Sequence, residues 1–257
     1  MFVLVIVFIV LPFFLLGVFA AKKTVEPNAS FGVGLQDFCY KEFSEKNSLL
    51  DREDGRIPGV NAALSLKSEK YLLGLSFSYT QGDVDYNGQT QGGLPYKTMT
   101  SERIVDASIS LGILNLIKMT KPSVLYFGLG FHEWQRHILP TSTVFGLVET
   151  YYWPYGFFGG KVELLKRENI TLWIDGRLTR PINPIMNICF SNYDCEDLHL
   201  GVKIGGRASL PIHYRWDAKN ELIVEPYFES WNFGRSSDES LTINGVSAGG
   251  AIHEPRS

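Results

Sequence analysis

Apolar and polar side chains alternate along most of the chain that follows residue 21. In residues 71–80 the apolar positions are Leu73, Leu75, Phe77 and Tyr79, and the positions between them are Gly, Ser or Thr. Alternation with a period of two indicates a β-strand with one apolar face. The same pattern predicts strong strands over residues 104–113, 125–131, 172–179 and 198–210, and weaker strands over residues 31–43, 59–67, 152–167 and 222–231.

The connections between these predicted strands alternate in length. Short connections are expected at residues 68–70, 115–122, 168–169 and 211–220, and long ones at residues 44–58, 81–101, 136–146, 182–196 and 233–250. Several strands have ten to thirteen residues, which suits a tilted crossing of a bilayer better than a soluble sheet. The pattern predicts an all-β fold, an antiparallel transmembrane β-barrel of about ten strands. A secreted soluble β-sandwich is the alternative.

The polar face of the strands and the tryptophans add detail to this prediction. The polar face is rich in Gly and Ser, which suits a crowded barrel interior. Trp134, Trp153 and Trp231 lie at strand ends beside the long loops, where a membrane-interface girdle is expected.

The first twenty residues form one apolar run without a charged side chain. We interpret residues 1–20 as a signal peptide cleaved after Ala20, because Val18 and Ala20 are small residues at the positions a signal peptidase reads. A single membrane anchor is the alternative. The missing positive charge before the run suggests that Met1 is not the true start. Residues 21–257 are then one barrel domain.

The end of the chain departs from the usual barrel pattern. Counting from Phe31 gives about nine strands, and a tenth begins near Ala251 shortly before the chain stops at Ser257. We therefore expect the tenth strand to be truncated.

Composition excludes several classes of function. A formal net charge of −3 gives no field that would attract nucleic acid, and three cysteines are too few for a disulfide scaffold.

Cys189 and Cys195 lie in one predicted loop and are candidates for a local disulfide, which leaves Cys39 without a partner. No motif for a phosphate, a dinucleotide, a nucleophile elbow or a zinc site is present, so we expect no cofactor and no metal.

Four segments resemble a known family. They are residues 50–59 (LDREDGRIPG), 82–95 (GDVDYNGQTQGGLP), 225–231 (EPYFESW) and 254–257 (EPRS). Together they resemble a group of uncharacterised proteobacterial outer-membrane β-barrel proteins. The resemblance implies one more strand after the EPRS element, and it implies no particular activity or ligand.

An Asp–Asp pair and an Asp–His pair suggest one enzymatic alternative. Asp83 and Asp85 lie in one predicted long loop, and Asp197 and His199 follow another. Omptins, which are ten-strand outer-membrane proteases, use an Asp pair and an Asp–His pair to position a water molecule, with His as the general base. The spacing here is similar but the surrounding sequence is not, and such pairs also arise by chance. A non-enzymatic role is therefore favoured.

Nine charged residues share the predicted lumen. Mixed charges in a narrow barrel favour a plugged interior, in which the charges pair with one another, over a narrow polar conduit. The residues are Asp106, Lys161, Glu163, Asp175, Arg177, Lys203, Arg207, Glu225 and Glu229.

The function predicted from the sequence is that of a non-enzymatic protein of the bacterial outer membrane, either structural or a narrow, porin-like conduit for small solutes. The alternatives are the omptin-like protease and a surface binding module that acts through its long loops. The expected partners are the outer-membrane lipid bilayer and the barrel-assembly machinery; no nucleic acid is expected, and the sequence names no ligand.

Overall fold

The structure, a computed structural model, describes residues 25–89, 93–116, 121–189, 193–255 and 257. The predicted signal peptide, residues 1–20, lies outside these described residues. Within them, no helix has the length and apolar character needed to cross a membrane.

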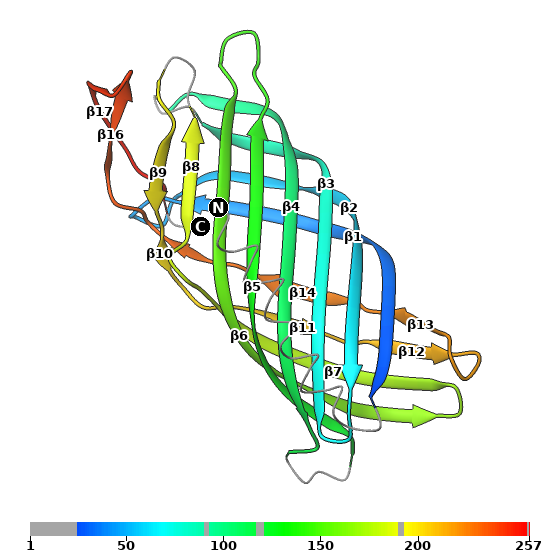
Figure 1. The fold of residues 1–257 in the computed structure, drawn as a ribbon. Helices are drawn as coiled ribbons and strands as arrows, with labels where there is room; N and C mark the ends of the chain where they lie inside the picture. Colours follow the sequence, from blue (N-terminus) through cyan, green and yellow to red (C-terminus); the bar gives the residue numbers. More distant parts are fainter. Residues whose placement is uncertain (1–24, 90–92, 117–120, 190–192, 256) are drawn as a thin grey trace.

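One antiparallel sheet dominates the fold and curls into a half-barrel (Figure 1). Nine strands follow one another along it, and each pairs antiparallel with the next. In order they are β1 (Glu26–Phe43), β2 (Leu49–Lys67), β3 (Tyr71–Gln89), β4 (Pro95–Leu114), β5 (Ser123–Ile138), β6 (Leu147–Arg167), β7 (Ile170–Pro181), β11 (Gly205–Ser209) and β14 (Tyr227–Ser230).

The last two positions of the sheet are interrupted by proline. Strand β12 (Ile212–Arg215) follows β11 after Pro211 and also pairs with β7, while β13 (Glu221–Val224) pairs with β12 and precedes β14. Proline has no N–H to donate to the ladder, so a strand breaks at Pro211 and at Pro226. Across the break, Leu210 N–H donates to the Pro226 carbonyl at 3.0 Å, which keeps the two interrupted strands together.

The predicted strand over residues 198–210 is in fact divided. It contains part of β9 (Glu196–His199) and all of β10 (Gly201–Val202) and β11. The division arises because the chain changes partners: β9 pairs with β8 (Ile185–Cys189), whereas β11 pairs with β7. Strand β8 itself pairs with the part of β6 that extends beyond β7, and β10 pairs with β15 (Phe233–Gly234).

The tenth strand expected near Ala251 is also different in the structure. Residue 251 belongs to β17 (Val246–Ile252), which forms a separate hairpin with β16 (Glu239–Ile243) at the end of the molecule that carries the long loops (Figure 1). Asn244 and Gly245, with φ of 51° and 75°, make the tight turn between them. Only Asn and Gly adopt such positive φ values readily, and Asn-Gly is the preferred sequence for a two-residue hairpin turn.

Strands are longer than the sequence predicted. Strand β3 continues to Gln89 and β4 begins at Pro95, so most of the predicted loop over residues 81–101 is strand. The predicted loop over residues 44–58 likewise shrinks to a turn, because β2 begins at Leu49. In these extensions the outer face carries charged side chains instead of apolar ones, so the alternation that marks a strand in sequence disappears.

The two faces of the sheet differ in chemistry. Outward side chains in the middle of the strands are large, apolar and exposed, as Phe31 (75%) and Val33 (80%) illustrate. Similar exposed apolar side chains occur on the other strands of the sheet: Leu64, Phe77, Phe127, Leu129, Phe158, Leu178 and Phe228. The inner face carries polar and aromatic side chains and holds the buried core of the molecule.

Candidate functional site

The largest fully buried charged side chain in the described residues is that of Arg136. It lies on β5, where Trp134, Arg136 and Ile138 occupy successive inward positions and are all buried. The period of two in a strand places such alternate residues on one face. Arg136 therefore points into the interior at the end of the sheet that bears the long loops.

Carboxylates from three strands surround the Arg136 guanidinium. Its Nη1 donates to Glu149 Oε2 at 2.6 Å on β6 and to Glu42 Oε1 at 3.3 Å on β1, and its Nη2 donates to Glu53 Oε1 at 3.0 Å on β2. The guanidinium also lies over the ring of Tyr40, 4.1 Å from its centroid. The guanidinium thus joins β5 to its neighbour β6 and also to β1 and β2, which are not adjacent to β5 in the sheet, and these bonds fix the curl of the sheet at this level.

Three further carboxyl groups complete this cluster. Asp51 lies 3.8 Å from Arg136 Nη2, and Glu102 accepts a hydrogen bond from Trp134 Nε1 at 2.5 Å. Burial raises the pKa of Glu102 well above its ordinary value, and the nearby Glu53 carboxylate raises it further, which favours the protonated form of Glu102. We refer to the set as the Arg136 cluster: Arg136 with Glu42, Asp51, Glu53, Glu102, Glu149 and Glu254.

Glu254 joins the cluster from the last described segment of the chain. The hydroxyls of Tyr151 and Tyr40 donate to Glu254 Oε1 at 2.7 and 3.1 Å. Burial raises the pKa of Glu254 well above its ordinary value, and the carboxylates of Glu42 and Glu149 raise it further. The protonated form is therefore favoured there, which reduces the excess of negative charge around a single guanidinium.

Aromatic rings fill the interior beside the Arg136 cluster. Four successive inward positions of β6 are Tyr151, Trp153, Tyr155 and Phe157, and all four are buried. Trp153 stacks on the His132 ring at 4.4 Å and meets the Trp231 ring at 5.2 Å. Trp134 and Trp153, which the sequence predicted in an outer girdle, therefore belong to the inner core, because their parity on the strand directs them inward.

A second ion network lies further along the inner face, toward the short turns. Arg177 donates to Glu229 at 3.1 Å, and Arg207 donates to Glu229 at 3.0 Å and to Glu225 at 3.1 Å. These four residues come from the set predicted for the lumen, and the register of β7, β11 and β14 brings them together.

Three of the other five predicted lumen charges have separate partners. Asp106 is bonded to His132 at 3.0 Å, Asp175 accepts from the Tyr126 hydroxyl at 2.5 Å, and Lys161 lies over the Trp173 ring at 5.1 Å. Glu163 is half-buried beside a bulge in β6, and Lys203 is exposed in an irregular segment before β11.

The residue pairs that suggested a protease do not come together. Asp83 and Asp85 are exposed, and Val84 and Tyr86 between them are buried on the inner face. Asp197 and His199 are also exposed, on β9, on either side of the buried Leu198. All four side chains lie on the outward face, because each alternates with a buried inward residue, so they do not face one another across the interior.

The structure contains a disulfide between Cys189 and Cys195 at the end of the molecule that bears the long loops. Next to it, Asp194 Oδ2 accepts hydrogen bonds from Gly245 N–H at 2.8 Å and from the Thr242 hydroxyl at 2.7 Å. These contacts join the connection between β8 and β9 to the β16–β17 hairpin. Cys39 is a free, exposed thiol.

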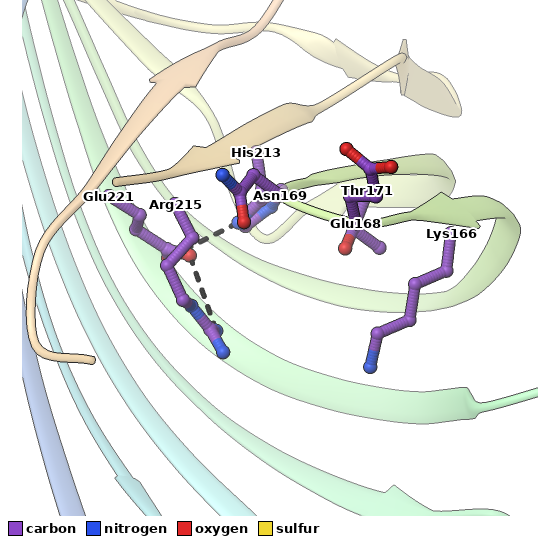
Figure 2. Close-up of a pocket in the computed structure, with 7 residues that line it drawn as sticks. All are labelled: Lys166, Glu168, Asn169, Thr171, His213, Arg215 and Glu221. Carbon is purple, nitrogen blue, oxygen red and sulfur yellow. Dashed lines mark hydrogen bonds and ion pairs between the residues drawn. The ribbon is translucent and has the colours of Figure 1, made fainter. Parts of the chain in front are cut away.

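A small polar cavity of about 60 Å³ lies at the opposite end, beside the short turns (Figure 2). Its walls include Lys166, Thr171, His213, Arg215 and Glu221. Glu221 is bonded to His213 Nδ1 at 3.2 Å and lies 3.7 Å from Arg215 Nη2, the two interactions drawn in Figure 2. This volume has room for water but not for a substrate. Across the described residues, no group of three or more His, Cys, Asp or Glu side chains is arranged to hold a metal ion.

Comparisons with known proteins do not extend this picture: no protein-family model matches the chain, and no curated protein matches it significantly.

The sequence did not identify Arg136 as a central residue, because the predicted strand ended at Phe131 and residue 136 fell in a loop. The sequence does contain a signal. Tyr126, His132, Trp134 and Arg136 all occupy even-numbered positions, the inward positions of this strand, and the series continues beyond Phe131. A polar residue at an inward position beyond the apolar segment indicates that the strand continues.

Proposed function

We propose that this chain is a non-enzymatic β-barrel protein of the bacterial outer membrane whose interior is closed at the long-loop end by the Arg136 cluster. The observation that carries the proposal is the combination of an apolar outer face with a buried interior in which charged side chains pair with one another. A soluble sheet protein buries its apolar face and exposes its polar face, which is the reverse arrangement.

The apolar outer face has sharp limits along each strand. On β2, outward side chains are apolar over the nine residues from Pro58 to Leu66, and the outward positions before them are Arg52, Asp54 and Arg56. On β3, the outward apolar residues end at Tyr79, and Gln81, Asp83 and Asp85 follow. A transmembrane β-strand needs about nine to eleven residues, so a band of this depth supports a bilayer crossing. The Arg136 cluster lies beyond this band.

The directions of the outermost strands support a closed barrel of ten strands. Eight antiparallel steps separate β1 from β14, so these two strands run in the same direction and do not form an antiparallel pair with each other. One further strand between them, antiparallel to both, would close the barrel. Open strand edges in lipid leave backbone N–H and C=O groups unpaired at several kcal/mol each, which favours closure.

The packing of side chains in the interior favours a plugged barrel over an open conduit. Arg136 has no accessible surface, and Tyr151, Trp153 and Tyr155 are buried directly beneath it. In a ten-strand barrel the lumen is only slightly wider than one that side chains fill. A solute passing through would have to displace a guanidinium bonded to three carboxylates.

The first test is to express the full-length protein and measure heat-modifiability of its band in outer-membrane fractions on a gel. A closed barrel migrates as a folded species that shifts on boiling. A soluble periplasmic protein without a shift would contradict the membrane proposal and support the secreted β-sandwich.

Conductance in a planar bilayer then tests the plug. The wild-type protein is expected to conduct little. The combined variant Glu53→Ala, Arg136→Ala and Glu149→Ala is expected to show discrete conductance steps, provided that its heat shift is retained. Steady conductance in the wild-type protein would support the conduit instead. As a matched control, Asp37→Ala and Arg56→Ala remove an ion pair from the outer face and should leave conductance unchanged.

A further inference from the structure

Exposed cations gather at the end of the sheet where the short turns lie. All of the short connections carry them: Lys67 and Lys70 flank the turn from β2 to β3, and Lys121 precedes β5. Lys166 and Arg167 precede the turn into β7, and Lys219 lies in the turn into β13. We call these six residues the short-turn rim.

The short-turn rim differs from the opposite boundary of the apolar band in how its charges are paired. At that opposite boundary, the outward cations Arg52, Arg56 and Arg103 each form an ion pair at 2.8 Å, with Asp54, Asp37 and Glu133. None of the six rim cations forms an ion pair with any residue that the structure describes, and Lys121 Nζ donates a hydrogen bond to the Leu164 carbonyl. Lys41 and Lys97 at the opposite boundary are also exposed without an ion pair, so the two boundaries differ in degree: some of the cations are paired at the long-loop boundary, and none is paired at the rim.

Acidic residues near the rim do not cancel its charge. The exposed carboxylates there are those of Glu26, Glu69, Glu168 and Asp217, four against six cations. Asp217 is occupied by its own turn, where it accepts from the backbone N–H groups of Lys219 and Asn220 at 2.7 and 2.8 Å. Arg215 is not counted with the rim, since it pairs with Glu221 at the cavity of Figure 2.

Exposed aromatic side chains mark the same level. Tyr71 (45%), Tyr214 (45%) and Trp216 (55%) lie at the short-turn ends of their segments, next to rim cations. Tyr and Trp favour the interface between a bilayer and water, where an aromatic body meets the acyl region and a polar tip meets the headgroups. Their level on the sheet coincides with the edge of the apolar band, so the rim cations lie where lipid phosphates would lie.

We propose that the short-turn rim binds the headgroups of anionic phospholipids, with the phosphates as counterions for its unpaired lysine and arginine side chains. This inference rests on the proposed membrane-spanning barrel and adds a lipid class to it. A basic side chain close to an anionic bilayer surface gains about fivefold in binding. Several such contacts around one rim select an anionic lipid over a zwitterionic one.

The test uses the quenching of tryptophan fluorescence by brominated lipids in vesicles that contain the full-length protein. Trp216 is exposed at the rim, whereas Trp134 and Trp153 are buried in the interior, so brominated chains quench mainly Trp216. The variant Trp216→Phe shows how much of the quenched fluorescence comes from Trp216. Brominated phosphatidylglycerol is compared with brominated phosphatidylcholine at low and high salt, since salt screens exposed charges.

We expect phosphatidylglycerol to bind at the rim about fivefold more tightly than phosphatidylcholine, and the preference to shrink at high salt. Combining Lys67→Gln, Lys70→Gln, Lys121→Gln and Lys166→Gln should reduce the ratio to about one. The matched control combines Lys41→Gln, Arg52→Gln, Arg56→Gln and Lys97→Gln on the outward face beyond the other boundary, and it should keep the preference.

Two outcomes separate failure of this inference from failure of the barrel. Equal quenching by the two lipids, or a preference that the rim variant retains, overturns the lipid inference while the barrel stands. Absence of quenching by either lipid in a folded protein means that Trp216 is not at a bilayer, which contradicts the membrane proposal itself and the inference with it.

Discussion

Arg136 and Glu149 lie directly opposite each other in the register of β5 and β6, and Nη1 of the arginine is 2.6 Å from Oε2 of the glutamate. Both side chains point to the inner face, where neither meets solvent to any extent. A cross-strand pair of opposite charges is a common way to stabilise a sheet. Here the pair also reaches two strands on the far side of the curl, because the same guanidinium bonds Glu42 and Glu53.

Arg136→Met should lower the free energy of unfolding by about 3 to 5 kcal/mol. The substitution keeps much of the side-chain volume but leaves Glu53 and Glu149 buried beside other carboxyls with no cation to balance them. The measurement is urea unfolding of the refolded protein followed by tryptophan fluorescence. A loss below about 1 kcal/mol would mean that the cluster is solvated in solution.

The matched control is Arg56→Met. Arg56 also forms an ion pair at 2.8 Å, with Asp37, but their side chains are 73% and 83% exposed on the outer face. Exposed pairs contribute about 0 to 1 kcal/mol, so this variant should unfold at nearly the wild-type urea concentration. The comparison separates burial of the pair from the mere presence of an arginine–carboxylate contact.

How much of the fold the sequence could predict depends on where each strand meets the apolar band. Inside the band the two faces differ, so the alternation in residues 71–80 and 104–113 predicted strands that the structure contains. Beyond it the outer face becomes charged: Asp83 and Asp85 point outward, while Val84 and Tyr86 point inward and are buried. The apolar positions change from the outer to the inner face, so the alternation of the band does not carry on although the backbone ladder continues.

For the interior, the sequence predicted some of the side chains that face inward but not which of them contact one another. Parity along each strand indicated that Arg177, Arg207 and Glu229 face inward, and the structure joins them in one network. Which side chains meet depends on register between strands, as the pairing of Arg136 with Glu53 across 83 residues illustrates. Register is set by turn lengths and by the fit of opposing faces, and neither can be read from one strand alone. The Asn244–Gly245 dipeptide is typical of a two-residue hairpin turn, and the sequence interpretation did not use it.

Gly130→Ala should destabilise the protein by about 1 to 3 kcal/mol, because its inward position has no space for a methyl group. A Cβ there would come within 2.2 Å of the Tyr155 ring. The ring has little freedom to move, since its hydroxyl donates to Asp106 at 2.9 Å and the residue is fully buried. Urea unfolding measures the loss.

Gly176→Ala is the control for Gly130→Ala. Gly176 lies on the outward face of β7, and a Cβ there meets nothing within 4 Å. We expect its stability to match the wild-type protein or to exceed it slightly, because alanine restricts the unfolded chain. An equal loss in both variants would mean that strand glycine itself, and not the Tyr155 contact, decides the result.

Reduction of the disulfide between Cys189 and Cys195 should cost about 2 kcal/mol at most, since it closes a short loop. Thiol alkylation followed by mass measurement checks the assignment: one cysteine, Cys39, should react in the unreduced protein and three after reduction under denaturing conditions. Cys39→Ser should leave stability unchanged because that thiol is exposed. Alkylation of all three cysteines without reductant would contradict the disulfide.

Asp194 makes the contact between the two hairpins at the long-loop end dependent on pH. Hydrogen bonds from Gly245 N–H and from the Thr242 hydroxyl lower the pKa of Asp194 below its ordinary value, and a bond from Asn244 N–H lowers it further. A carboxylate whose pKa is depressed by folding contributes stability above the unfolded pKa, near 4, and loses that contribution as the pH falls through the lower, folded value. We expect exchange of the Gly245 N–H with solvent to remain slow at neutral pH and to quicken, relative to the intrinsic rate, only below about pH 4.

Asp194→Ala should quicken exchange of the Gly245 N–H at neutral pH, whereas Asp217→Ala, at the opposite end of the molecule, should not. Protection of Gly245 that survives Asp194→Ala would show that the β16–β17 turn holds this amide without the carboxylate.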